Sequence, residues 1–463
     1  MVFSSITFLF YFLPIVLGLY FIAPGIKLKN IVLLAASLFF YAWGEPVYVI
    51  LMLISITGNF FLGKYLGIGR EKAGVKIYFV IAVAWNILIL LFFKYTNMFI
   101  RLAASVTHLE LRELNLTLPI GISFYTFQIL SYVIDVYRGK VKSQKSFVSF
   151  ALYVTMFPQL IAGPIVKYED IESELSERRI TLAQAGKGAE RFLFGLAKKV
   201  LLANSLGAIF SEISGMAADS RSVVVVWIGA IAYAFQIYFD FSGYSDMAIG
   251  LGQAMGFKFP ENFNYPYIAS GVTDFWRRWH ISLSTWFRDY VYIPLGGNRV
   301  STFKHIRNLL IVWALTGLWH GASWNFVLWG LYYAFWLILE KYVLGQFLEK
   351  HRVVGHLMTG FIVLFGWVLF AFTDLGTLGT YFLQMFGIGA SGFITKTGGW
   401  YLFASAGLLL ISALFSTPIP MRVYRNLMRR LKPVCIAILL ILLILCTAFL
   451  VYQSYNPFLY FRF

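Results

Sequence analysis

Long runs of apolar residues separated by short polar loops make up most of this 463-residue chain. A helix rises about 1.5 Å per residue and the hydrocarbon core of a bilayer is about 30 Å thick, so roughly 20 apolar residues can cross it. The pattern predicts an all-α, polytopic membrane protein with about eleven or twelve transmembrane helices. The runs fall at about 6–23, 31–43, 47–63, 77–99, 119–137, 148–165, 191–210, 222–250, 309–339, 356–373, 400–416 and 434–452.

Composition agrees with this fold class, because 59% of the residues are hydrophobic and only 13% are charged. Segment 434–451 is continuously apolar, whereas strands of a membrane barrel alternate apolar and polar residues, so a barrel is excluded. The chain turns apolar directly after Ser5, without a basic region or a small-residue cleavage site, and we expect a retained first helix. No soluble domain or repeat is recognisable, so residues 1–463 are expected to form one integral-membrane domain.

Segment 258–308 departs from the pattern of apolar runs. It is too charged to span a bilayer and too aromatic to be a free loop. Amphipathic interfacial helices and a re-entrant segment buried in the protein both fit this composition. Its basic residues are Lys258, Arg277, Arg278, Arg288, Arg299, Lys304 and Arg307.

The basic residues, which give a formal charge of +17, lie in short clusters between the apolar runs. No nucleic-acid motif accompanies them, and anionic lipid headgroups and loop orientation explain them better. By the positive-inside rule both termini, including 452–463, are expected outside the cytoplasm. The clusters are Lys27 and Lys29, then Lys64, Arg70, Lys72 and Lys76, then Arg138, Lys140, Lys142 and Lys145, and finally Arg422, Arg425, Arg429, Arg430 and Lys432.

His320 lies inside the apolar run 309–339, about 20 Å along a helix from the charged end at Arg307. Ionisable residues at such depth are costly and mark functional sites. Burial favours the neutral imidazole, which can accept a proton from a hydroxyl, the first requirement of O-acyl transfer. The sequence therefore offers His320 as a catalytic base, with a proton relay or a packing histidine bonded to a helix carbonyl as alternatives.

His280, which stands 40 positions earlier in segment 258–308, is the second candidate. The alternative is an interfacial histidine beside Arg277 and Arg278. These arginines either attract the phosphates of an acyl donor or anchor the segment at lipid headgroups. Paired arginines next to Trp276 and Trp279 are common at membrane interfaces, which favours anchoring.

Gln236 and Asp240 lie four positions apart in the run 222–250 and so share one helix face. They either line a polar tunnel or hydrogen-bond to neighbouring helices. The prolines in segment 158–164 predict a helix broken inside the membrane, where protein or a cavity must satisfy its backbone.

No metal site is predicted, because the histidines lack ligand spacing. Cys435 and Cys446 are separated by roughly 16 Å of helical rise, too far for a disulfide, and are expected in the core. The chain has no phosphate-binding loop, nucleophile elbow or dinucleotide fingerprint.

Four segments in order along the chain resemble the membrane-bound O-acyltransferase (MBOAT) superfamily. They are 118–128, 236–246, 276–289 and 315–324. The opening 1–5 and segment 37–46 are similar to its bacterial alginate O-acetylation branch. The resemblance extends over nearly the whole chain.

This resemblance implies that His320 occupies the place of the family's essential histidine, and that His280 matches its second position. It implies a helical ring around a central tunnel, in which a cytoplasmic donor and an external acceptor reach one histidine from opposite sides. The implied reaction is O-acetylation of an exported, alginate- or cellulose-like polysaccharide at the bacterial cytoplasmic membrane. Acetyl-CoA would be the donor, no cofactor would be bound, and an external SGNH-type subunit would be the partner.

The candidate substrate-binding or donor-binding residues are Gln236, Asp240, Trp276, Arg277, Arg278 and Asn325. Two other functions stay open. One is D-alanyl transfer to teichoic acid by a related MBOAT branch that uses a carrier protein. The other is a transporter or channel, since intramembrane Asp240 and Asp246 also suit ion pathways, although the chain shows no repeated halves.

Overall fold

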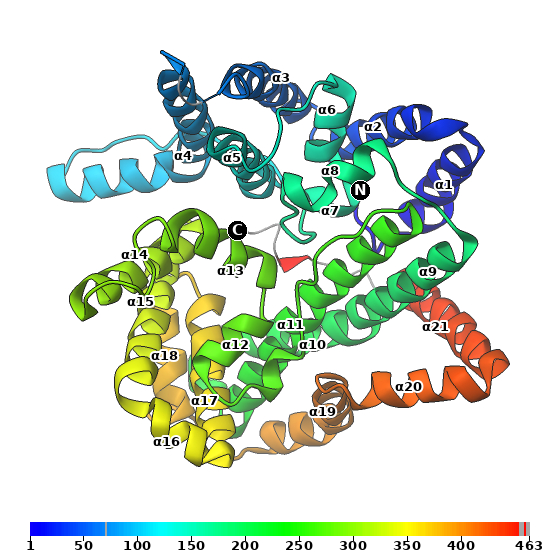
Figure 1. Ribbon diagram of the computed structural model, residues 1–463. Coiled ribbons are helices and arrows are strands. Elements are labelled where there is room, and N and C mark those ends of the chain that lie inside the picture. Colours follow the sequence, from blue (N-terminus) through cyan, green and yellow to red (C-terminus); the bar gives the residue numbers. More distant parts are fainter. Residues whose placement is uncertain (70–71, 453–457, 460–463) are drawn as a thin grey trace. The chain divides into compact units, whose positions relative to one another are not determined.

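The computed structural model describes residues 1–69, 72–452 and 458–459, and in these residues all regular structure is helical (Figure 1). The predicted all-α class is therefore confirmed. Arg70 and, apart from Phe458 and Leu459, the predicted external segment after Tyr452 lie outside the described residues.

The chain forms two compact units, of which the first comprises residues 1–192 and 244–260. It contains a π-helical turn, η1, and most of the N-terminal helices. Their bounds are η1 (Phe8–Phe12), α1 (Leu13–Ile22), α2 (Gly25–Gly44), α3 (Tyr48–Leu66), α4 (Val75–Thr107), α5 (Ile122–Arg138), α6 (Phe147–Thr155), α7 (Phe157–Leu160), α8 (Tyr168–Ser176) and α9 (Leu182–Ala197), which continues into the second unit.

The second unit comprises residues 193–243 and 261–463, and it holds both histidines of interest. Its elements begin with η2 (Lys198–Ala203), α10 (Asn204–Gly215), η3 (Ala218–Ser220) and α11 (Val223–Ala254), which ends in the first unit. They continue with η4 (Pro266–Ile268), α12 (Val272–Arg278), α13 (Ile281–Phe287), η5 (Arg288–Tyr292), α14 (Thr302–His320), α15 (Trp324–Leu339), η6 (Glu340–Leu344), α16 (Gly345–Lys350), α17 (Arg352–Ala371), α18 (Leu375–Met385), α19 (Lys396–Phe415), α20 (Ile419–Arg430) and α21 (Lys432–Tyr452).

Nine helices within the described part of the chain are long and apolar enough to cross a membrane, fewer than the eleven or twelve predicted. The run 6–23 yields only a shorter apolar helix, Phe8–Ile22, and the run 119–137 yields the 17-residue α5. The run 148–165 breaks, as its prolines predict, into α6 and the four-residue α7. Three of the apolar runs therefore fold as shorter or broken helices.

The run 309–339 was wrongly predicted as one helix, since it is a hairpin of α14 and α15. A Cβ atom added at Gly317 would lie 2.2 Å from the Phe326 carbonyl oxygen, and one at Gly330 would lie 2.3 Å from that of Trp313. The two helices thus pack backbone against backbone, as small residues allow. The turn, residues 321–323, is short, uncharged and partly buried, which is why hydropathy alone does not reveal it.

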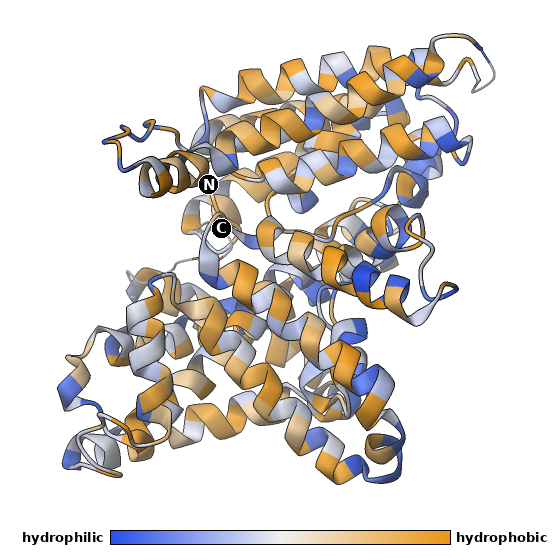
Figure 2. Ribbon diagram, turned by 90° about the vertical axis from the view of Figure 1, so that its left-hand side faces the viewer, coloured by the Kyte–Doolittle hydropathy of each residue, from blue (hydrophilic) through white to orange (hydrophobic). Residues whose placement is uncertain are grey.

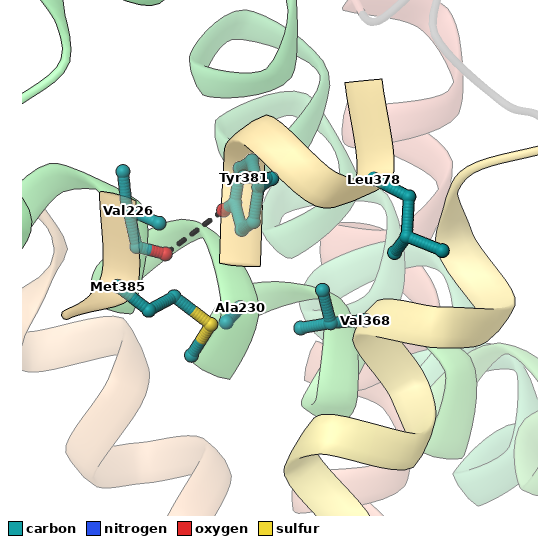
Figure 3. Packing of buried hydrophobic residues seen from close by; sticks show 6 residues of the cluster. All are labelled: Val226, Ala230, Val368, Leu378, Tyr381 and Met385. Carbon is teal, nitrogen blue, oxygen red and sulfur yellow. Dashed lines mark hydrogen bonds between the residues drawn. The ribbon is translucent and has the colours of Figure 1, made fainter. Parts of the chain in front are cut away.

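Exposure separates lipid-facing helices from internal ones. In α21 only 11% of the most apolar 18-residue window is buried, whereas in α11 the share is 78%. Figure 2 shows hydrophobic residues along the helices and hydrophilic ones mostly at helix ends and loops. In the second unit, α11, α17 and α18 pack around Val226, Ala230, Val368, Leu378, Tyr381 and Met385, with the Tyr381 hydroxyl donating to the Val226 carbonyl over 2.8 Å (Figure 3).

Candidate active site

A pocket of about 430 Å³ in the second unit is lined by both His280 and His320. Small-molecule sites usually enclose about 300–1,000 Å³, so the volume suits a ligand. The pocket is built from α12, α13, η5 and α14, with one residue from α15. Its other lining residues are Thr273, Trp276, Arg277, Trp279, Ile281, Leu283, Ser284, Thr285, Phe287, Arg288, Tyr292, Leu309, Val312, Trp313, Thr316 and Leu337.

Segment 258–308 folds into short helices that turn sharply at His280. This residue adopts a left-handed conformation with φ 44°, between the end of α12 and the start of α13. Such a backbone is uncommon for a residue other than glycine and is held only where the surroundings fix it. Phe275, Trp279 and His280 are all buried, which favours the buried segment over a free interfacial helix.

Asn262 fixes the orientation of the His280 ring. The Asn262 Oδ1 atom accepts a hydrogen bond from the backbone N–H of Ser282 and lies 3.0 Å from His280 Nδ1. Because a backbone amide can only donate, Oδ1 is the acceptor and Nδ1 carries the hydrogen, so the lone pair lies on Nε2. His280 lies outside the spanning helices, and burial lowers its pKa to about 3, which keeps the ring neutral.

His320 is the last residue of α14 and is only 4% exposed. Three aromatic rings meet its imidazole edge to face, those of Trp319 and Trp329 at 5.0 Å and that of Phe370 at 5.1 Å between centroids. They come from α14, α15 and α17, so three helices fix the position of the ring. His320 therefore lies where α14 ends and the chain turns toward α15. The sequence instead predicted a position in the middle of one long helix.

The two neighbouring arginines, Arg277 and Arg278, differ in their contacts. Arg277 is exposed and lines the pocket, next to the buried Trp276, which also lines it. Arg278 forms a 2.8 Å ion pair with Asp274 one turn earlier and bonds to the Asn264 carbonyl, and it is not among the lining residues. Arg277 is therefore placed to bind a ligand. Arg278 instead stabilises segment 258–308 through its contacts with Asp274 and Asn264.

Asp240 forms a buried ion pair with Lys199, with 2.7 Å between Oδ1 and Nζ. Its other oxygen accepts a hydrogen bond from the backbone N–H of Leu459 at 2.9 Å. Gln236, one turn earlier on α11, is also buried, and neither residue lines the pocket. Buried charges are paired in this way because an isolated one is very costly, so these contacts favour the helix-bonding role for Asp240.

Asn325 is fully buried at the start of α15, and its amide group donates to the carbonyls of Leu369 and Phe370 at 3.3 and 3.4 Å. It joins α15 to the end of α17 and does not line the pocket. The sequence-based interpretation missed Lys199, Asn262, Arg288 and Tyr292. The charge of Lys199 inside the apolar run 191–210 is a local signal that could have found it, whereas Asn262 and Tyr292 carry none.

Within the described ranges, no three His, Cys, Asp or Glu side chains gather closely enough to hold a metal ion. Cys435 and Cys446 are both free and buried, as core residues are expected to be. The lining of the pocket carries imidazole, guanidinium, hydroxyl and aromatic groups.

The fold and the pocket define a multi-pass helical membrane protein with two buried histidines at one site. A sequence model of the membrane-bound O-acyltransferase (MBOAT) family matches residues 140–384, which include every residue of the pocket. The chain belongs to this family and is an acyltransferase.

Several relatives are similar over most of the chain. The probable alginate O-acetylase of Azotobacter vinelandii is 42% identical, with 84% of this chain and 79% of the relative aligned. That of Pseudomonas putida is 39% identical over the full length of both proteins. The peptidoglycan O-acetyltransferase of Helicobacter pylori is 34% identical over 81% of this chain and 78% of its own.

A teichoic acid D-alanyltransferase of Bacillus subtilis is more distant. It is 30% identical over 48% of this chain and 58% of its own length.

Proposed function

We propose that this protein takes acetyl groups from cytoplasmic acetyl-CoA and passes them across the membrane for O-acetylation of an exported polysaccharide. The observation that carries the proposal is one pocket lined by His320, His280 and the cations Arg277 and Arg288. The names of the alginate and peptidoglycan acetylating relatives support an acetyl group and a carbohydrate acceptor.

In the proposed reaction, His320 takes the proton of an acceptor hydroxyl as its oxygen attacks the thioester carbonyl. The new carbon–oxygen bond forms, the carbon–sulfur bond breaks, and the imidazolium returns the proton to the leaving thiolate. His280, whose lone pair lies on Nε2, orients the hydroxyl as a hydrogen-bond acceptor. The surrounding aromatic rings exclude water, which would otherwise hydrolyse the thioester.

The pocket volume of about 430 Å³ suits the thioester arm of the donor rather than the whole molecule. Arg277 and Arg288 lie on the wall formed by α12 and η5 and supply positive charge for the donor's phosphates. Arg288 also forms a 2.8 Å pair with Asp289, so Arg277 is the stronger candidate.

Mass analysis of the cell-surface polysaccharide with and without the gene tests this proposal, since it reports the acyl group and the acceptor together. Loss of acetyl esters from one exported polymer is expected in the deletion strain. An unchanged acetyl content in every surface polymer would refute it.

The setting and partner are part of the proposal. We place the protein in the bacterial cytoplasmic membrane with both termini outside, because the basic clusters mark the opposite side as cytoplasmic. An external SGNH-type subunit is proposed to receive the acetyl group and pass it to the polymer. Cysteine labelling from each side at Lys27 and at Glu45, at opposite ends of α2, reports the orientation.

D-alanyl transfer to teichoic acid is the second candidate, favoured by the similarity to the Bacillus subtilis enzyme. The same mass analysis separates the two functions, because alanyl and acetyl esters differ in mass and in charge. A gene neighbourhood with a D-alanine ligase and carrier protein would favour this second candidate.

A further inference from the structure

The π-helical turn η6, which follows α15, is linked by hydrogen bonds to two elements of the pocket lining. Through Glu340 it reaches α12, which contributes Trp276 and Arg277. Through Tyr342 and the intervening His305 of α14 it is linked to η5, which contributes Arg288 and Tyr292. Neither Glu340 nor Tyr342 lines the pocket itself.

The Glu340 carboxylate caps the N-terminus of α12. One oxygen accepts from the backbone N–H of Thr273 at 3.1 Å, and the other accepts from the N–H of Val272. Gly271, the residue before the helix, offers no side chain to do this, and a Cβ there would meet the carboxylate at 3.2 Å. Helix N-termini bind negative charge because their first amides lack partners, so Glu340 fixes the start of α12.

Tyr342 acts through His305, a buried residue of α14. The Tyr342 hydroxyl lies 2.6 Å from His305 Nδ1, and the Tyr292 hydroxyl lies 2.8 Å from Nε2. A neutral imidazole has one donor and one acceptor nitrogen, and each hydroxyl can fill either role, so both bonds form together. Burial, and secondarily Lys341, lowers the pKa of His305, which favours this neutral bridge.

We propose that Glu340 and Tyr342, named here the η6 brace, are positioning residues for the acyl donor. They hold α12 and η5 at the spacing that places Arg277 and Tyr292 against the bound donor. This inference rests on the proposed function, because it assigns the pocket to acetyl-CoA. The brace touches neither the donor nor the reacting atoms, so it acts on donor binding and leaves the histidines in place.

The test compares two variants in proteoliposomes, with the acetyl-transfer rate measured against acetyl-CoA concentration. Tyr342→Phe removes the hydroxyl bonded to His305. Glu340→Gln keeps one side-chain oxygen that can accept from the start of α12. It replaces the other oxygen with an NH2 group, which faces a backbone N–H and cannot accept from it. Each is expected to raise KM roughly three- to tenfold, the effect of losing one such hydrogen bond, with kcat nearly unchanged. Tyr65→Phe and Glu349→Gln, at exposed positions outside the pocket lining, are matched controls and leave KM unchanged.

Arg277→Gln distinguishes failure of the brace from failure of the donor site. If Arg277→Gln raises KM and the brace variants do not, the brace is refuted and the donor site stands. If none of them changes KM, both are refuted. A fall in kcat at constant KM in the brace variants would also overturn the inference, because it indicates a smaller folded fraction.

Hydrogen exchange provides a readout that is independent of the donor. In Glu340→Gln the amides of Val272 and Thr273 are expected to exchange faster than in the unchanged protein, while those of α17 do not change. Equal protection at these two amides would overturn the brace.

Discussion

Two histidines 40 positions apart line one pocket, and each is held by a different kind of contact. His280 is oriented by a hydrogen bond to Asn262, and His320 by edge-to-face packing against three rings. Each arrangement fixes an imidazole ring in one orientation, which a general base requires.

Asn262→Leu is expected to reduce stability and activity together. The substitution removes the buried oxygen that faces His280 Nδ1 and accepts from the Ser282 N–H, at a cost of about 1–3 kcal/mol. Thermal unfolding in detergent and acetyl transfer by the remaining folded protein measure the two effects. Full specific activity of that folded fraction would show that Asn262 does not orient His280.

The Lys199–Asp240 pair predicts a strong but partly reversible loss of stability. Lys199→Met leaves Asp240 as a buried single charge, which costs about 3–5 kcal/mol. Adding Asp240→Leu removes that charge and is expected to restore much of the loss. A double variant as unstable as the single one would contradict the contribution of pairing, and unfolding temperatures in detergent decide between them.

Arg277 and Arg278 are adjacent in sequence, yet they predict different phenotypes. Arg277→Gln is expected to weaken acetyl-CoA binding several-fold, since Arg277 lines the pocket. Arg278→Gln is expected to leave donor affinity nearly unchanged, because its contacts are with Asp274 and Asn264. Binding titrations with purified protein measure both affinities. An equal loss of acetyl-CoA affinity in the two variants would contradict the different roles of Arg277 and Arg278. Sequence alone cannot separate these neighbours, because their directions depend on the short helix that carries them.

At the scale of elements, the α14–α15 hairpin places His320 at the pocket. Its apolar pattern continues through the turn at Gly321, so the sequence predicted a single long span where two helices pack closely. Sequence did predict the break within 148–165 and the unusual character of 258–308, because proline and clustered charge are local signals. It could not predict the hairpin, which depends on contacts between glycines 13 positions apart, Gly317 and Gly330.

Gly317→Ala is expected to destabilise the protein by several kcal/mol, because its Cβ would overlap the Phe326 carbonyl and force the hairpin apart. Gly360→Ala on α17 is the matched control, since a Cβ there meets nothing within 4 Å, and it is expected to be neutral or slightly stabilising. Thermal unfolding in detergent compares the two variants. Equal unfolding temperatures would show that α14 and α15 do not pack through these glycines.

At the scale of the whole molecule, membrane physics predicted the class and left the reaction open. Composition and apolar runs indicate a polytopic helical protein, and they do so without any knowledge of chemistry. The ordered motifs indicated the MBOAT family, which the family model and the relatives confirm. The pocket then adds what neither provides, since it brings His320 together with Arg277 and His280 of segment 258–308.

The central claim is that His320 is the base of acyl transfer, and it is tested most directly by His320→Ala in the native host. We expect the variant to reach the membrane at the normal level, while acetyl esters on the exported polysaccharide fall to the level of the deletion strain. Acetylation retained near the normal level, with the variant protein present in the membrane, would contradict the account.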